Sequence, residues 1–242
     1  MVTLNCGAVQ FEGIEAVIFD KDGTLEDSRA FLRELSYRRS RLIDAQIPGT
    51  GEPLLMAFGV QDDQIDPTGL MAVGSRHENH IAAAAYIAET GRGWFESLAI
   101  ANQAFDDAAQ YVPNTSPLFD GSLDIIQTLF NAGLKIAILS SDSTPGIQHF
   151  VERNQLSDYI QLMIGSDQGL HKPDPALFVR TCQTLGVDPK ATVMVGDSQG
   201  DIQMAQQAGA GGTIGICWGN ADASQLKQAD VAIANLNQIQ LI

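Results

Sequence analysis

Residues 16–25, AVIFDKDGTL, form the most informative segment of this chain. Four apolar residues rich in β-branched side chains predict a buried strand, and two aspartates separated by one residue follow it directly. Gly23 permits a sharp turn at this point. One carboxylate can attack an electrophile while the other transfers a proton, provided that their surroundings differ. The motif therefore favours catalysis by Asp20 and Asp22.

The flanking sequence argues against two structural alternatives for this motif. An Asp-Gly hairpin needs a partner strand, but residues 28–44 have helical spacing. An EF-hand loop needs a helix before it and a glycine at a different position. Neither alternative fits a strand that leads through this turn into a helix.

Short apolar segments repeat this arrangement along the chain, and most are followed by a turn and a segment of helical periodicity. Strands so uniformly apolar are typical of a parallel sheet covered by helices on both faces. We therefore expect a doubly wound, Rossmann-like α/β fold. The predicted strands are Ala16–Phe19, Lys135–Leu139, Gln161–Ile164, Thr192–Val195, Thr213–Ile216 and Val231–Ile233, and the predicted helices are Ser122–Asn131, Pro145–Arg153, Pro175–Leu185 and Asp201–Ala208.

A long insertion separates the first two predicted strands. Residues 28–116 have helical periodicity, and a loop of that length without secondary structure is implausible in a compact domain. We expect these residues to form an inserted, all-helical cap domain. Residues 1–27 and 117–242 then form the core.

Three further polar groups follow predicted strands. Asp197 and Asp201, four residues apart, suit a hard cation such as Mg²⁺, which prefers carboxylate oxygens. Ser140, before a predicted helix, can form a phosphate-sized anion site with nearby backbone N–H groups. Lys172 lies in a loop flanked by prolines. Because ligands bind at the carboxyl ends of strands in an open α/β sheet, we expect these groups to converge with the first two aspartates.

Each of these residues has a structural alternative when it is taken alone. Asp201 could cap a helix, Ser140 could simply end a strand, and Lys172 could be a solvated surface charge. Their common position at the ends of successive strands favours the functional interpretation.

In this order, DxDGT, an apolar run ending in Ser, Lys-Pro and GDxxxD resemble the four motifs of the haloacid dehalogenase-like (HAD) superfamily. The helical insertion between the first two motifs resembles its phosphoglycolate phosphatase and β-phosphoglucomutase-like branch. The resemblance covers the whole predicted core. It implies a Mg²⁺-dependent phosphatase that acts on a small phosphorylated metabolite, such as phosphoglycolate or a sugar phosphate, through an aspartyl-phosphate intermediate.

The resemblance also implies roles for the residues of the first and last motifs. Asp20 would be the nucleophile and a metal ligand. Asp22 would be the general acid and base, with its backbone carbonyl on Mg²⁺, and Thr24 would help to orient its loop. Asp197 would be a further metal ligand, supported by Asp201.

The same resemblance assigns substrate binding. Ser140 and Lys172 would hold the phosphoryl group. Gly74-Ser75-Arg76 resembles the substrate loop of caps in this branch, so Arg76 could bind a second anionic group, with an ordinary surface position as the alternative. His171 stands where a small residue commonly precedes the lysine, and it could either touch substrate or serve the structure.

Two positions of the first motif depart from the family pattern. Lys21 and Glu26 stand where apolar residues are more usual. Lys21 could pair with a nearby carboxylate, and the sequence assigns it no function. Trp218-Gly219, after a predicted strand, could border the pocket or pack in the core.

Two other functions stay open. A β-phosphoglucomutase-like phosphosugar mutase would use the same catalytic residues. A non-catalytic phospho-acceptor or binding module, such as a receiver domain, also places acids at strand ends, although it lacks DxDGT and the helical insertion. Dehalogenases and phosphonate hydrolases of the family are disfavoured by Asp22 and by the Asp197–Asp201 pair.

The composition limits the partners. The chain has 242 residues, with 29 acidic against 14 basic side chains and a net charge of −15. This excess argues against nucleic acid and anionic membranes, which select clustered Lys and Arg. Three cysteines without a CxxC motif indicate neither a disulfide framework nor a zinc site. Without a signal peptide or a membrane-length apolar run, a cytoplasmic protein is expected, and its oligomeric state cannot be read from the sequence.

Overall fold

The computed structural model describes residues 1–218 and 226–242, which divide into two compact units. One unit comprises Met1–Asp27 and Leu118–Ile242, and the other comprises Ser28–Pro117. Among the helices described, none combines the length and the apolar character needed to cross a membrane.

The first unit is built on a parallel sheet, and it has the predicted Rossmann-like α/β fold. The described strands of this sheet are β3 (Ala16–Phe19), β6 (Lys135–Leu139), β7 (Leu162–Ile164), β8 (Thr192–Gly196), β9 (Gly212–Ile216) and β10 (Val231–Ile233). Their order is β10-β9-β8-β3-β6-β7. The chain therefore builds the sheet outward from β3 in one direction, then returns to the other side of β3 and builds in the opposite direction.

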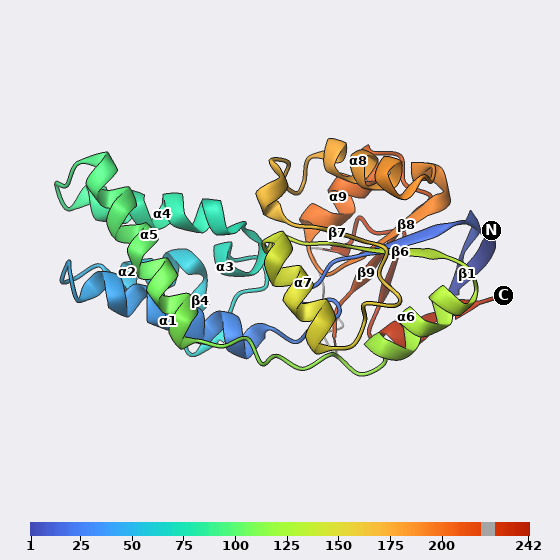
Figure 1. Cartoon of the computed structure of the whole chain (residues 1–242), viewed down its shortest axis with the longest axis horizontal. Helices are drawn as coiled ribbons and strands as arrows, with labels where there is room; N and C mark the ends of the chain where they lie inside the picture. Colours follow the sequence, from blue (N-terminus) through green and yellow to red (C-terminus); the bar gives the residue numbers. More distant parts are fainter. Residues whose placement is uncertain (219–225) are drawn as a thin grey trace. The chain divides into compact units, whose positions relative to one another are not determined.

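Helices cover both faces of this sheet (Figure 1). In β3, Val17 and Phe19 belong to the core that includes the helices of one face, and Ala16 and Ile18 belong to the core of the other face. Because successive side chains of a strand point to opposite faces, a strand of four apolar residues is buried on both sides. One face packs against α6 (Ser122–Asn131) and α7 (Thr144–Arg153), and the other against α8 (Pro175–Leu185) and α9 (Gln199–Gln207).

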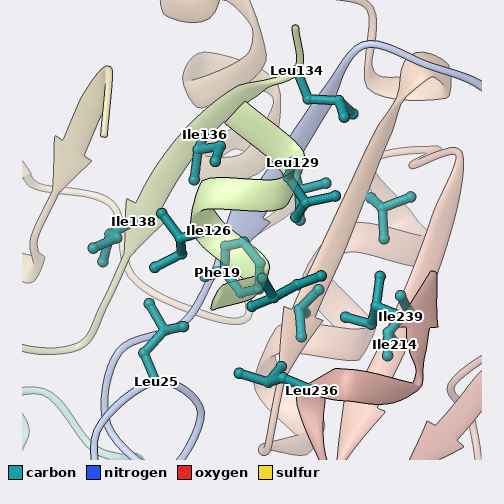
Figure 2. Close-up of a cluster of buried hydrophobic side chains, with 14 of the residues drawn as sticks. Phe19, Leu25, Ile126, Leu129, Leu134, Ile136, Ile138, Ile214, Leu236 and Ile239 are labelled. Carbon is teal, nitrogen blue, oxygen red and sulfur yellow. The ribbon is translucent and has the colours of Figure 1, made fainter. Parts of the chain in front are cut away.

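The larger of these two cores surrounds Phe19. Figure 2 shows its ring among side chains from α6, from neighbouring strands and from the C-terminal segment, with Leu25 beside it. Phe19 and Leu25 are both fully buried, and they flank the loop of residues 20–24. The loop between them is therefore anchored at both ends in the same apolar cluster.

The predicted elements of this unit are right in kind, and their ends either coincide with the structure or differ from it by one or two residues, the usual uncertainty of helix and strand boundaries. The largest difference is at α9, which begins at Gln199 rather than at Asp201. Ser198 is its N-cap, so Asp201 lies within the first turn.

A second, antiparallel sheet was not predicted. It joins β1 (Val2–Cys6), β2 (Val9–Ile14) and β11 (Ile239–Leu241) in the order β11-β1-β2. The expectation that Val231–Ile233 is the last strand is therefore wrong. Cys6 of β1 pairs with Ile239 of β11, and such pairing between the two ends of a chain leaves no local pattern in the sequence. Short 3-10 turns complete the unit: η1 (Ser166–Gln168), η2 (Pro189–Ala191) and η4 (Leu236–Gln238).

The second unit is helical, with one exception. Its helices are α1 (Arg29–Asp44), α2 (Gly51–Phe58), α3 (Leu70–Val73), α4 (Arg76–Glu89) and α5 (Trp94–Tyr111). The expectation of an all-helical segment is wrong, because the unit contains a short β-hairpin. In this hairpin β4 (Val60–Gln61) pairs with β5 (Gln64–Ile65). Asp62 and Asp63 both have positive φ, which is the backbone of a type I′ hairpin turn.

The core of the second unit includes a buried arginine. The Arg39 guanidinium lies 4.0 Å from the centre of the Phe105 ring and donates to Met71 Sδ at 3.3 Å. Arg39 is therefore a core residue of this unit, although it carries a charge. Its aliphatic stem and planar head pack in the core in the way that amphipathic side chains cover apolar surface.

Candidate active site

The site begins with the three central strands of the parallel sheet. β3 lies between β8 and β6, and all three run in the same direction. The backbone N–H of Asp20 extends the ladder by donating to the Val195 carbonyl at 2.9 Å. Asp197 and Ser140 follow the two neighbouring strands. These residues therefore leave the sheet at the same edge, at the point where the strand order reverses and where open α/β sheets bind ligands.

Three carboxylates meet at this edge. Oxygens of Asp20, Asp197 and Asp201 all lie within 4.8 Å of one another. Asp20 is 5% exposed and Asp201 is fully buried. Buried carboxylates this close together repel one another, so the cluster requires positive charge.

Lys172 supplies part of that charge. It comes from the loop between β7 and α8, and its Nζ lies 2.5 Å from Asp20 Oδ1 and 2.6 Å from Asp201 Oδ1. Burial lowers the pKa of Lys172, but the two carboxylates outweigh this effect and raise the pKa above its ordinary value. The side chain therefore remains a cation although it is buried.

One ammonium does not compensate three carboxylates. Burial, together with the neighbouring Asp201 and Asp22, raises the pKa of Asp20 to about 7, although the charge of Lys172 opposes this shift. Burial likewise raises the pKa of Asp197, with Asp20 and Asp201 adding to the effect. A divalent cation would supply the missing charge, and carboxylate oxygens are its preferred ligands. The residues present therefore fit a divalent metal ion.

Two glycines allow these carboxylates to approach the backbone. A Cβ on Gly23 would lie 2.0 Å from Asp197 Oδ2, and one on Gly196 would lie 2.5 Å from Asp201 Oδ2. Gly23 also has a φ of +78°, which disfavours other residues. The glycine after Asp22 is thus needed for the turn and for the room that Asp197 occupies.

Asp201 serves the helix and the cluster together. Ser198 Oγ accepts from the Asp201 backbone N–H at 3.2 Å, and Asp201 Oδ2 accepts from the Ser198 backbone N–H at 3.2 Å, which forms a capping box at the start of α9. Ser198 Oγ also donates to Asp201 Oδ2 at 2.6 Å. The other carboxylate oxygen faces Lys172. The capping alternative is therefore correct for Asp201, and it coexists with the contact to the lysine.

Ser140 lies in the loop between β6 and α7. It is 4% exposed, and its Oγ accepts from the Asp142 backbone N–H at 3.1 Å. Ser143 caps α7 by accepting from the Gly146 N–H at 3.2 Å. A hydroxyl just before a helix N-terminus is an arrangement suited to an anion.

The side chain of Asp22 is paired with Lys21, which the sequence predicted could pair with a nearby carboxylate without saying which one. Lys21 Nζ lies 2.9 Å from Asp22 Oδ1 and 2.8 Å from Oδ2, and it also contacts Glu26 and Asp142. Burial lowers the pKa of Lys21, but these three carboxylates raise it above its usual range. Lys21 and Glu26 carry opposite charges at two positions where the family usually has apolar residues. This pattern was the signal in the sequence for an ion pair inside the first motif.

Trp218 holds the turn of the first motif, whereas Thr24 is buried within it. Trp218 Nε1 donates to the Gly23 carbonyl at 3.0 Å, and the indole stacks on Phe119 with ring centres 3.9 Å apart. Thr24 is fully buried, and its Oγ1 has no hydrogen-bond partner among the described residues. Gly219, which the sequence analysis associated with Trp218, lies outside the described residues.

The two residues proposed for specificity lie in different units. Arg76 is at the start of α4, and its guanidinium donates to Asp106 at 2.6 Å, with both side chains well exposed. Ser75 before it caps the helix, so the Gly-Ser-Arg segment is a helix start. His171 directly precedes Lys172, and its Nδ1 is buried without a hydrogen-bond partner in the described part of the chain.

Comparison with known proteins places this arrangement in a family. Residues 14–209 match the family model of haloacid dehalogenase-like hydrolases. The chain is 31% identical to a probable phosphatase, IndB, from Dickeya dadantii (strain 3937), over 88% of this chain and 86% of that protein. It is 30% identical to a phosphoglycolate phosphatase from Yersinia pestis, over 89% and 88% of the two chains.

Solved structures support the same fold. A predicted phosphoglycolate phosphatase from Haemophilus somnus 129PT superposes with a TM-score of 0.69 at 23% identity, over 92% of this chain and 95% of that one. A HAD phosphatase from Thermococcus onnurineus superposes with a TM-score of 0.66 at 20% identity, over 93% and 95%. With its four motifs gathered at one sheet edge and a family match across most of its length, this chain belongs to the haloacid dehalogenase-like hydrolases.

Proposed function

We propose that this protein is a Mg²⁺-dependent phosphatase that hydrolyses a small phosphorylated metabolite through an aspartyl-phosphate on Asp20. The observation that carries the proposal is the contact of the Lys172 ammonium with Asp20 and Asp201 inside a carboxylate cluster at the strand-order reversal. A carboxylate nucleophile can react with an anionic phosphate ester only where nearby cations offset the repulsion. The phosphatase names of the relatives support the same reaction.

Asp20 attacks phosphorus in the first step, and the bond to the alcohol oxygen breaks. Asp22 gives its proton to that oxygen as the alcohol leaves. Asp22, now a carboxylate, then takes a proton from a water molecule that attacks the aspartyl-phosphate. Inorganic phosphate leaves, and Asp20 is restored.

The remaining groups bind charge. Lys172 and the Ser140 hydroxyl hold the phosphoryl oxygens, and Lys172 offsets the charge that develops on them. Asp20, Asp197 and the backbone carbonyl of Asp22 would hold Mg²⁺, with Asp201 in support. When bound, the ion neutralises phosphoryl charge and keeps the nucleophile and the ester together.

Substrate choice is assigned to the helical unit, residues 28–116, acting as a cap. Arg76 is its candidate for a second anionic group of the substrate. Its ion pair with Asp106 is solvent-exposed, and exposed pairs contribute little stability, so a substrate carboxylate or phosphate could replace Asp106 at small cost. Phosphoglycolate, the substrate in the names of several relatives, carries such a carboxylate.

A phosphate-release screen over a panel of phosphorylated metabolites tests the proposal. We expect Mg²⁺-dependent release of inorganic phosphate, loss of activity in EDTA, and recovery on adding Mg²⁺. Asp20→Asn should lower kcat by at least about 10³-fold, while Asp158→Asn, a substitution of the same chemistry at an exposed position, should leave it unchanged.

Three results would contradict the proposal. Near-normal hydrolysis by Asp20→Asn would remove the nucleophile assignment. Isomerised sugar phosphate without released phosphate would indicate a mutase. A stable aspartyl-phosphate without turnover would indicate a phospho-acceptor.

A further inference from the structure

A buried lysine lies in the first motif between the two aspartates. Lys21 is 1% exposed, and three carboxylates surround its ammonium. Its Nζ lies 2.9 and 2.8 Å from the two oxygens of Asp22, 3.1 Å from Glu26 Oε2 and 3.2 Å from Asp142 Oδ2. The Phe150 ring, 5.8 Å away, lies on the apolar side. A buried charge is tolerated only when it is paired in this way.

Both the backbone and the side chain of Lys21 are fixed by neighbouring residues. Its backbone carbonyl accepts hydrogen bonds from the N–H groups of Leu25 and Glu26, both at 3.0 Å. Glu26 is fully buried and is also bound by Arg153 of α7. Asp142 belongs to the loop that carries Ser140. The ammonium therefore joins the first motif to α7 and to the loop after β6.

Asp22 differs from its neighbours in exposure. Its side chain is 20% exposed, whereas Lys21 and Glu26 are buried. A partly exposed aspartate is able to turn toward solvent, and proton transfer to a leaving group requires a fixed position. An ammonium that binds both carboxylate oxygens restricts this rotation.

We propose that Lys21 is a positioning residue for the proton transfers of Asp22, and that Glu26, Arg153 and Asp142 keep its ammonium in place. The inference rests on the proposed phosphatase function, in which Asp22 protonates the departing alcohol. Lys21 itself touches neither the nucleophile nor the phosphoryl group in this scheme. It acts through the orientation of one carboxylate.

The inference predicts a dependence on the leaving group. An alkyl alkoxide is a poor leaving group and needs the proton of Asp22 as the phosphorus–oxygen bond breaks. 4-Nitrophenolate departs without a proton. Since kcat/KM reports the steps up to departure of the alcohol, the ratio of kcat/KM for an alkyl and a 4-nitrophenyl phosphate measures proton donation apart from general damage to the site.

The experiment compares Lys21→Met with wild type on an alkyl phosphate from the screen and on 4-nitrophenyl phosphate. For the alkyl ester we expect kcat/KM to fall by about 10–100-fold, with little change for the aryl ester. Lys190→Met removes an exposed lysine and should leave both values unchanged. In an Asp22→Asn background, Lys21→Met should cause no further loss, because the two residues act as one unit.

In Lys21→Met, the buried Glu26 loses an ion-pair partner, which could destabilise the fold. A second variant is therefore needed. The double variant Lys21→Leu/Glu26→Leu replaces both buried charges by apolar side chains. Proteins often tolerate such a replacement of a buried ion pair. The positioning role predicts that this variant folds and still loses alkyl-ester activity selectively.

Two results would overturn the assignment of Lys21. One is a folded variant with the wild-type ratio of the two kcat/KM values, and the other is an additive loss in the Asp22→Asn background. Wild-type protein that hydrolyses neither ester would instead contradict the proposed function, so the two failures are distinguishable.

Discussion

Individual residues of the candidate site are packed closely against one another. Gly23 faces the Asp197 carboxylate, and Lys172 lies between Asp20 and Asp201 at hydrogen-bond distance from each. Burial makes each charge depend on its neighbour, because water cannot replace a missing partner. Single substitutions here should therefore have effects that differ sharply from those of similar substitutions elsewhere.

Gly23→Ala should abolish activity by displacing Asp197. The added Cβ would meet Asp197 Oδ2 at 2.0 Å in a backbone of positive φ. We expect kcat/KM for a phosphate ester to fall by more than about 10²-fold and the affinity for Mg²⁺ to weaken. The measurements are steady-state kinetics and Mg²⁺ titration.

Gly133→Ala is the matched control for that variant. Gly133 has a φ of +84° and no atom within 4 Å of an added Cβ. It should lose about 1 kcal/mol of stability from backbone strain and keep its activity. Equal kinetic losses in the two variants would show that backbone strain, and not the contact with Asp197, causes the effect.

The stability of the metal-free protein should fall as the pH rises toward neutrality. Burial and neighbouring carboxylates raise the pKa of Asp20 from 3.8 to about 7, so the folded state binds more protons than the unfolded state between these values. The free energy of unfolding then decreases with increasing pH across this window, by about 4 kcal/mol for one such group.

Urea unfolding in EDTA between pH 5.5 and 8 measures this slope. Asp20→Asn removes the ionising group and should flatten the curve, most visibly below pH 7. If wild type and variant show the same slope, Asp20 is not the group responsible. Saturating Mg²⁺ should also reduce the slope, because the ion favours the carboxylate form.

At the scale of elements, strand ends and helix starts create the site together. β3, β8 and β6 deliver the aspartates and Ser140 to one edge, and α9 begins where Asp201 is needed. Asp201 thereby contributes one oxygen to its own helix and one to Lys172. The start of α9 and the geometry of the carboxylate cluster are consequently linked.

Ser198→Ala tests this link. Loss of the cap should cost about 1 kcal/mol of stability, and release of Asp201 should weaken Mg²⁺ binding and lower kcat. Ser75→Ala removes the same kind of capping box from α4 and provides the control. It should cost similar stability, and hydrolysis of an aryl phosphate should be unaffected. If both variants keep full activity and Mg²⁺ affinity, the cap of α9 has no part in the site.

At the scale of the whole molecule, the two ends of the chain meet in one sheet. Both termini lie on the same side of the first unit in Figure 1, where β1 pairs with β11. Ile239 of β11 lies in the core cluster of Phe19, as Figure 2 shows. Ile239 therefore belongs to the apolar core that also contains Phe19 of β3.

Ile239→Ala should destabilise the protein by about 2–4 kcal/mol, as large-to-small substitutions in a core do. Gln240→Ala, at the exposed neighbouring position, should change stability by less than about 0.5 kcal/mol. Chemical denaturation of the two variants compares them directly. Similar stabilities would show that the terminal strand contributes little to the core.

Charge at this scale acts separately from charge at the site. The net charge of −15 disfavours polyanionic partners, while the site itself relies on one buried lysine among carboxylates. A single phosphate group can thus be bound by local charge although the protein as a whole is strongly acidic. At physiological ionic strength, salt screens the interactions of exposed charges that lie more than about 8 Å apart. Buried charges such as those around Lys172 are screened much less.

The α/β fold and most of its elements could be predicted from the sequence, because uniformly apolar strands and helical periodicity are local patterns. It also predicted that Asp20, Asp197, Ser140 and Lys172 belong to one site, since parallel strands place their carboxyl ends at a common edge. The roles of these residues in catalysis stay predictions, and the experiments above test them.

Three features could be found only in the folded chain: the pairing of the chain ends, the carboxylate that Gly23 faces, and the partners of Lys21. Each of these depends on atoms far apart in the sequence or on the direction of a side chain. A lysine between two aspartates has the same local pattern whether it points to water or into the core. Its burial beside Glu26 follows from packing against α7, and packing is a property of the folded chain.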